Sequence, residues 1–430
     1  MTPTVAERQA AMWIAGLFLT AVLVQRFSVP GLTTVALLVP LTLLWTAAAW
    51  VKGVVVVDRS RLLGWLMVAV CTGGLLLVQL RVVEAAEISV RGWAILLVIW
   101  LAFVVRSAER SIAAYTTALH YITNIATGLA VASIAMILIQ VAGVPFQDWF
   151  GQVVPEFMQL AGFNTTYPIE FGSPIFKSNA FIGLEPSMIS AQLGVGVLAA
   201  LLSGARVWKL VVMVAGLVAT VAGSGMIIVI LGVLVMLVAR GSRRAVAWYI
   251  AAFAVVLGAA WFTKLGRLVF DRVGEFQSDS SSTSLRVFQP YRVLYPRWTQ
   301  DLAGAILGYG PGSSHRFAEE ANVADMLVTT PVKIFFEYGL LGGLILGAFV
   351  FYCYWGGPSR AFAVSLFVST WLLQAGLASL IITLPALVTI TLWSPRLGAP
   401  MESRLSEIRL QSSRRRAPSA ISRYAQTGAG

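Results

Sequence analysis

The residues best suited to chemistry lie in a long polar segment, residues 263–326, where arginines alternate with aromatic residues. Arg286, Arg292 and Arg297 follow one another through it. The planar fork of an arginine matches a phosphate or a carboxylate in two-point contact, and neighbouring aromatic faces can hold a sugar ring or a lipid headgroup. These arginines are therefore candidates for contacts with a phosphate or carboxylate of a substrate. Acidic residues leave the segment barely net basic, so internal ion pairs are the alternative, and we expect Arg297 to pair with nearby Asp301.

A glycine-rich sequence follows these arginines and ends at a histidine. It reads Gly308-Tyr309-Gly310-Pro311-Gly312-Ser313-Ser314-His315. Alternating glycines allow another backbone to approach closely, but as a phosphate loop the sequence is weak because no lysine follows in Walker spacing. His315 is either an ordinary surface histidine or a proton acceptor, and Tyr309 is a candidate substrate contact.

Three more charged residues lie where apolar runs begin. Lys333 and Glu337 are spaced i, i+4 and share a helix face. They are either an ion pair that lowers the cost of both charges in lipid or part of a site facing the polar segments. Glu185 precedes Pro186, which suits a helix start. It either caps that helix in its dipole or belongs to a site at the membrane surface.

The composition predicts that these residues are positioned by membrane helices. Of the 430 residues, 58% are hydrophobic and 12% are charged, whereas soluble domains carry roughly 25% charged residues. About 20 apolar residues cross ~30 Å of hydrocarbon. We predict an all-α integral membrane protein with about twelve spans, at 10–25, 31–51, 62–80, 89–105, 121–142, 186–203, 207–222, 226–239, 246–262, 328–355, 361–375 and 379–394.

The distribution of basic residues predicts the orientation of these spans. Lys and Arg total 31 against 19 Asp and Glu, a net charge of +12, and basic residues concentrate on the cytoplasmic side. Basic clusters flank 207–239 at both ends, so we expect a hairpin there with Gly223-Ser224-Gly225 as its turn. Both termini are expected in the cytoplasm, where the basic tail suits anionic lipids rather than nucleic acid.

The predicted organisation therefore has six parts. Helices one to five occupy 1–142, a first outer loop 143–184, helices six to nine 185–262, a large outer loop 263–326, helices ten to twelve 327–394, and a disordered basic tail 395–430.

Several motifs of other chemistries do not occur in the sequence. There is no Asp-x-Asp, His-Glu-x-x-His, Walker A or dinucleotide fingerprint. We expect no metal and no nucleotide cofactor. Cys71 and Cys353 both lie in apolar runs, which argues against a disulfide framework.

The chain resembles the superfamily of O-antigen ligases and of O-antigen and exopolysaccharide polymerases. Four pieces carry the resemblance, in the family's order: Lys177-Ser178-Asn179 with Gly183-Leu184-Glu185-Pro186-Ser187; Gly223-Ser224-Gly225; Arg286 ahead of Gly308-Tyr309-Gly310-Pro311-Gly312; and Lys333 with Phe336-Glu337-Tyr338-Gly339-Leu340-Leu341-Gly342. Together they span roughly residues 120–355.

The resemblance implies a metal-independent, inverting glycosyltransferase at the outer face of a bacterial cytoplasmic membrane. Its donor would be a glycan on undecaprenyl diphosphate and its acceptor a sugar hydroxyl, with a flippase and a chain-length regulator as partners. The resemblance implies catalytic roles for Glu185 and Glu337, and substrate contacts for Lys177, Asn179, Arg286, Arg292, Tyr309 and Lys333. The family's usual base is missing from this chain, so we expect either His315 or Glu185 to take its place. Family ligases carry a His-Asn pair where this chain has Val328-Thr329, which favours a polymerase-like member.

A flippase or transporter of lipid-linked oligosaccharide is the alternative function. A transporter places polar groups mid-membrane near broken helices, whereas here they collect in the two outer segments.

Overall fold

The computed structural model describes residues 3–83, 86–169, 173–239, 289–323, 326, 328–374 and 379–393, and this part of the chain is mostly helical. Five of its helices are long and apolar enough to cross a membrane: α1 (Val5–Val24), α3 (Arg59–Val82), α5 (Ile112–Val141), α7 (Pro186–Ser203) and α15 (Thr330–Trp355). The fold is therefore that of a helical membrane protein.

Six shorter apolar helices lie among the long ones. They are α2 (Leu38–Val51), α4 (Val90–Leu101), α8 (Val207–Ala219), α9 (Gly223–Ala239), α16 (Arg360–Leu366) and α17 (Leu380–Ala386). Turns of π-helix, Phe367–Leu372 and Leu387–Thr391, extend α16 and α17. Each expected span that the structure describes contains one of these helices, although the bounds differ in places. The stretch 246–262 and the tail 395–430 lie outside the described residues.

The expected helix over 31–51 is wrong in its first third. Residues Leu32–Ala36 form strand β2, which pairs with β1 (Ser28–Val29) across a turn at Gly31. The β-branched Thr33, Thr34 and Val35 favour the extended conformation. Helix α2 therefore begins only at Leu38 and, at 14 residues, is about 21 Å long.

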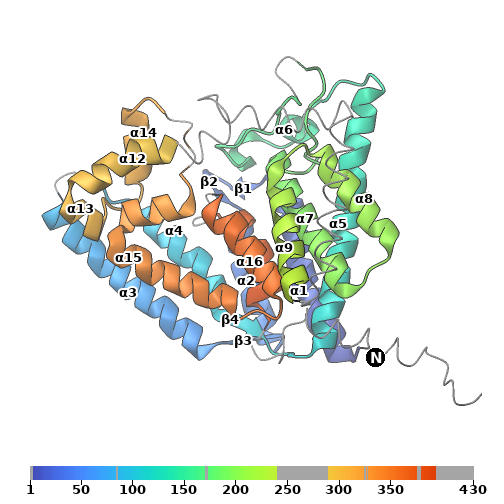
Figure 1. The fold of residues 1–430 in the computed structure, drawn as a ribbon, viewed down its shortest axis with the longest axis horizontal. Helices are drawn as coiled ribbons and strands as arrows, with labels where there is room; N and C mark the ends of the chain where they lie inside the picture. The colour runs from blue at the N-terminus through green and yellow to red at the C-terminus, as the bar shows by residue number, and fades with distance from the viewer. Residues whose placement is uncertain are drawn as a thin grey trace, which may run out of the picture.

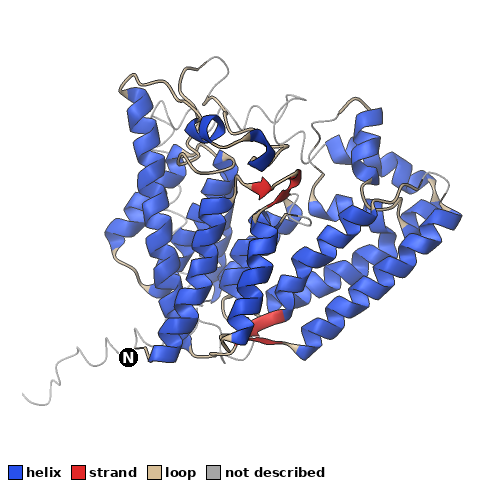
Figure 2. Cartoon of the chain, turned by 180° about the vertical axis from the view of Figure 1, so that it is seen from behind, coloured by secondary structure: helices blue, strands red, loops and turns tan. Residues whose placement is uncertain are grey.

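A second small sheet joins distant parts of the chain, so the fold is not purely helical. Strand β3 (Val55–Val57) pairs with β4 (Val105–Ser107). The two sheets lie toward opposite ends of the helices, with β3 and β4 at the end near the N-terminus (Figures 1 and 2). Arg61 holds the β3–β4 end together, because its buried guanidinium donates to the carbonyl oxygens of Thr391 (2.6 Å) and Val105 (3.3 Å).

The main core forms around α5, which packs against α1, α7 and α8, while α9 packs on α7 and α16. Helices α9 and α7 approach each other closely, because a Cβ on Gly225 would collide with the backbone carbonyl of Ser190. Small residues allow such contacts between membrane helices. The turn of the α8–α9 hairpin is residues 220–222, and the expected turn residues Gly223-Ser224-Gly225 open α9 instead.

The part of the large polar segment that the structure describes forms three helices with a core of their own. These are α12 (Gln289–Gln300), α13 (Leu302–Leu307) and α14 (Ser313–Glu320), grouped at one end of α3 and α15 (Figure 1). The buried side chains of this core come from α12, α14 and α15, from the C-cap of α3 and from the segments beside these helices: Val83, Leu294, Tyr309, Phe317, Ala318, Met326, Val328 and Phe336. Residues 289–323 are thus a folded cap on the membrane helices.

Candidate active site

A break in α15 organises the candidate site. At Gly339 the backbone has φ 64° and ψ −174°, a conformation essentially restricted to glycine, and the two pieces of α15 meet there at an angle (Figure 1). The break leaves the carbonyls of Phe336 and Glu337 without their partners four residues on. Backbone amides of Tyr309 and Gly310 donate to them, both at 2.9 Å, and the Glu337 carbonyl also accepts from Gln79 Nε2 at 3.0 Å.

The glycine-rich loop therefore fills the break in α15, and its Tyr309 and Gly310 amides are used in hydrogen bonds to that helix. On its other side it pairs with the α3–α4 connection, where the amides of Glu87 and Ser89 donate to Tyr309 and Pro311 carbonyls at 3.0 and 2.8 Å. A Cβ on Gly310 would collide with the backbone of Glu87. The alternating glycines thus allow close backbone approach, as the sequence indicated, to other parts of this chain.

Tyr309 packs inside the cap. Its side chain is 4% exposed, and its ring stacks on Phe336 with centroids 4.8 Å apart. Its hydroxyl donates to the Arg297 carbonyl at 2.9 Å, and burial, aided by Asp301, raises the pKa of that hydroxyl to about 12. The structure therefore gives Tyr309 a packing role inside the cap, and the expected contact with substrate stays a prediction.

Lys333, Glu337 and Ser314 form a buried network beside the break. Lys333 Nζ lies 2.9 Å from Glu337 Oε1, and Ser314 Oγ donates to the same oxygen at 2.5 Å. Lys333 also donates to Ser314 Oγ at 3.3 Å. Because Glu337 is 2% exposed, the ammonium and the hydroxyl stabilise its charge in a place where an unpaired carboxylate would be costly. The expected ion pair exists, and it is closed by a serine that sequence reasoning missed.

His315 follows Ser314 on α14 and is exposed. Lys333 lowers the pKa of His315 below its usual 6.5 and partial burial adds to this, while Glu337 and Glu319 oppose the shift. The imidazole is therefore neutral at pH 7 and able to accept a proton. His315 is therefore a candidate general base in this site, because its side chain is exposed and its imidazole is neutral.

The three arginines have different surroundings. Arg286 lies outside the described residues. Arg292 is exposed on α12. Arg297 pairs with Glu320 at 3.4 Å and lies 4.4 Å from the centre of the Phe317 ring. The expectation that Arg297 pairs with Asp301 is wrong, because the Asp301 carboxylate caps the N-terminus of α13.

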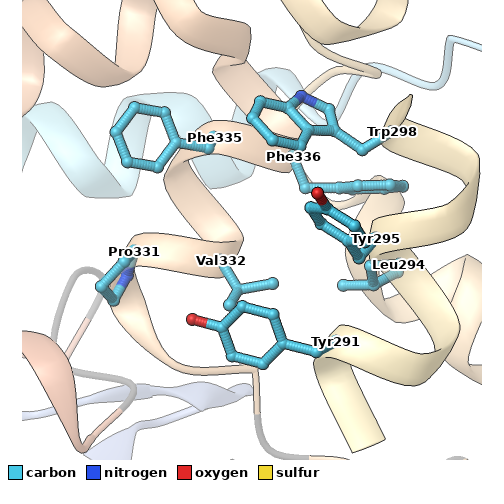
Figure 3. Close-up of a pocket in the computed structure, with 8 residues that line it drawn as sticks. All are labelled: Tyr291, Leu294, Tyr295, Trp298, Pro331, Val332, Phe335 and Phe336. Carbon is cyan, nitrogen blue, oxygen red and sulfur yellow. The ribbon is translucent and has the colours of Figure 1, made fainter. Parts of the chain in front are cut away.

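An aromatic groove of about 220 Å³ lies between α12 and the start of α15. Figure 3 shows its lining: Tyr291, Leu294, Tyr295 and Trp298 from α12, and Pro331, Val332, Phe335 and Phe336 from α15. Tyr291 and Tyr295 are each about half exposed, so their rings are accessible. Arg292 lies on the same helix between them in sequence.

A second group of expected residues lies in or next to residues 143–184, the segment predicted to be the first outer loop. It contains the short helix α6 (Trp149–Val153) and is tied to α1 through Arg26, whose guanidinium donates to both carboxylate oxygens of Asp148 at 2.7 and 2.5 Å. Near its end, Ala180 and Phe181 both have positive φ, 54° and 63°. Such backbone strain in non-glycine residues persists only where surrounding structure imposes it.

The amide of Asn179 holds this strained turn. It is fully buried, its Oδ1 accepts from the Phe181 amide at 3.1 Å, and its Nδ2 donates to the Thr165 carbonyl at 3.3 Å. Lys177 is also buried, with Nζ 5.6 Å from the centre of the Tyr167 ring. Asn179 therefore shapes the loop, and neither residue is openly exposed to a ligand.

Glu185 is the N-cap residue of α7, but its side chain does not cap the helix. Its Oε2 instead accepts from Ser187 Oγ at 2.9 Å, and the residue is partly exposed. The geometry therefore does not support the interpretation of Glu185 as a helix cap, and its role in a site at the membrane surface stays a prediction.

The segment that follows Glu185 is hydrogen-bonded to Gly223-Ser224-Gly225. Ser224 Oγ donates to the Ser187 carbonyl at 2.6 Å, and the Gly225 amide donates to Ser190 Oγ at 3.1 Å. The four sequence motifs thus associate in two pairs: the first with the second at α7 and α9, and the glycine-rich loop with the Lys333 motif at α15.

The chain matches no protein-family model, and no curated protein is significantly similar to it. The structural features must therefore carry any functional conclusion.

Two residues of this site were not predicted from the sequence. Ser314 and Gln79 reach Glu337 from other elements, with sequence separations of 23 and 258 residues. A glutamine in the apolar run of α3 was the one available signal, because buried polar groups must find hydrogen-bond partners.

Proposed function

We propose that the protein transfers a glycan from a lipid diphosphate carrier to a sugar hydroxyl at the outer face of a bacterial cytoplasmic membrane. One observation carries the proposal: the Lys333–Glu337–Ser314 network lies at a helix break, with neutral His315 next to it and an aromatic groove on the same helix. We infer a polymerase-like activity in place of a ligase.

In this proposal His315 accepts the proton of the acceptor hydroxyl as that oxygen attacks the anomeric carbon of the donor sugar. The bond from this carbon to the phosphate oxygen breaks, and the diphosphate leaves with the electron pair, which inverts the anomeric centre. Glu337 is buried and paired, so we assign it the role of positioning Lys333 beside His315. Glu185 remains a second candidate base.

Cations must stabilise the departing diphosphate. Arg292 is exposed on α12, the helix whose Tyr291 and Tyr295 line the aromatic groove, and we assign it this role together with Arg286. The tyrosine rings that flank Arg292 in sequence provide faces on which a sugar ring can stack. No metal is needed in this reaction, because the guanidinium groups supply the positive charge.

The alternative, a transporter of lipid-linked glycan, has one observation in its favour. Broken helices occur at the substrate sites of transporters, and α15 is broken at Gly339. Here, however, folded backbone from the cap occupies the break, so we favour transfer.

The test uses purified protein in liposomes with undecaprenyl-diphosphate-linked glycan. We expect longer glycan products and free undecaprenyl diphosphate, without added metal or nucleotide. If the lipid crosses the bilayer and no glycosidic bond forms, the transporter is correct and our proposal is wrong.

The same assay tests His315. A positioned general base contributes about 10²–10⁴-fold to a rate, so we expect His315→Gln to lose about this much turnover. Because the pKa of His315 is lowered, the wild-type rate should hold at pH 7 and fall only as the pH drops below 6.5. The variant should lose this acid-side fall. An unchanged rate in His315→Gln would exclude the role.

A further inference from the structure

A polar cluster lies on the exposed surface of the helix pair α5 and α8, away from the candidate active site. Lys209, in the first turn of α8, donates from Nζ to Asn124 Oδ1 of α5 at 2.5 Å. His120 lies four residues before Asn124 on the same face of α5 and interacts electrostatically with Lys209. Asn124 and His120 are exposed, so the cluster faces the surroundings of the helices.

The cluster is cationic, and no acidic residue of the described part of the chain is paired with it. Arg206, three residues before Lys209, is exposed at the start of α8. Among the residues that the structure describes, no carboxylate forms an ion pair with Lys209 or Arg206. A lysine on an apolar helix face without an acidic partner is costly in a membrane, so an anion from outside the chain would stabilise it.

The position of the cluster points to the depth of lipid headgroups. The connection between α7 and α8, residues 204–206, interrupts two apolar helices, and irregular backbone exposed to lipid does not occur within the hydrocarbon. This connection must therefore lie at a membrane surface, and Lys209 lies within one helical turn of it. Trp208, which is 52% exposed with its ring 5.6 Å from Lys209 Nζ, is typical of residues at that depth.

We propose that Arg206, Lys209, Asn124 and His120 bind the phosphate of an anionic phospholipid in the leaflet on the basic, cytoplasmic side of the protein. The cations supply the charge complementarity, and the Asn124 amide and His120 imidazole supply further donors. Basic pockets between membrane helices on this side are suited to anionic headgroups. This proposal does not depend on the proposed transfer of glycans.

Native mass spectrometry of the purified protein tests the proposal, with phosphatidylglycerol and phosphatidylcholine of identical acyl chains in competition. Each basic residue near an anionic surface contributes ~1 kcal/mol, so we expect Lys209→Gln to reduce the preference for phosphatidylglycerol about fivefold. Lys209→Arg keeps the charge and should keep the preference. The matched control is Lys52→Gln, which removes an exposed cation after α2, on the same side but outside the cluster, and should have no effect.

Each outcome decides the matter. An equal loss in Lys52→Gln would show that general surface charge attracts the lipid, and full retention in Lys209→Gln would exclude the site. If millimolar inorganic phosphate displaces the lipid completely, the cluster binds free phosphate and the lipid assignment is wrong. Should Lys209→Gln not be monodisperse, Arg206→Gln provides the same comparison from the exposed connection.

Discussion

At the scale of single residues, the candidate site depends on one buried carboxylate and the two groups that stabilise it. Glu337 is enclosed between α15, α14 and α3, and its Oε1 is shared by Lys333 and Ser314. Removing one partner of a buried charge is costly because the other is left uncompensated. The serine therefore matters more than its neutral side chain suggests.

Ser314 and its neighbour Ser313 offer a matched test of this point. Both are fully buried, but Ser313 Oγ donates to the neutral Gly310 carbonyl at 2.6 Å, whereas Ser314 donates to a carboxylate. Hydrogen bonds to charged groups contribute about 1.5–3 kcal/mol and neutral ones about 0.5–1.5.

We therefore expect Ser314→Ala to lose more unfolding free energy than Ser313→Ala, measured by thermal unfolding in the same detergent. Equal losses would mean that the network at Glu337 contributes no more than an ordinary buried hydrogen bond.

At the scale of elements, the break in α15 is what joins the cap to the membrane helices. Gly339 has a glycine-only conformation, and a Cβ there would collide with the backbone of Ile306 and Gly308. The loop 308–312, which carries α14 and thus Ser314 and His315, is held in the same place by backbone hydrogen bonds.

Substitution of Gly339 should therefore separate the cap from α15. A non-glycine residue in such a backbone conformation costs about 1–3 kcal/mol. We therefore expect Gly339→Ala to lower the free energy of unfolding by about 2 kcal/mol or more, and to expose residues 289–323 to protease.

Gly347 is the control on the same helix. A Cβ there meets nothing within 4 Å, so Gly347→Ala should be neutral or stabilise the helix by up to about 1 kcal/mol. Equal protease sensitivity of the two variants would show that the break does not anchor the cap.

At the scale of the whole molecule, the position of the cap relative to the membrane decides whether the proposed substrates can reach it. The cap and the strands β3 and β4 lie at opposite ends of α3 and α15 (Figure 1). The distribution of basic residues predicts that the β3–β4 end lies in the cytoplasm, and on this prediction the cap lies outside.

Cysteine labelling in intact cells tests this orientation in a background without Cys71 and Cys353. An impermeant maleimide should label cysteines at the exposed positions Asn164 and Thr299, and should label those at Lys52 and Arg110 only after the membrane is opened. If Thr299→Cys and Lys52→Cys are labelled from the same side, the proposed orientation is wrong.

The apolar runs and the placement of basic residues were enough to predict a helical membrane protein and most of its helix positions. These features are local, because about 20 apolar residues form a membrane helix largely independently of the rest of the chain. The i, i+4 pairing of Lys333 with Glu337 was readable for the same reason, since one helical turn determines it.

Tertiary structure alone decided how these elements combine. Ser314, Gln79 and Tyr309 reach the break in α15 across long sequence separations, and no local pattern encodes such contacts. Strand β2 replaced the expected start of a helix because it pairs with β1, and Arg297 pairs with Glu320 because α14 folds back onto α12. Backbone groups left unsatisfied by the break at Gly339 must find partners when buried, and only the folded chain shows that the glycine-rich loop supplies them.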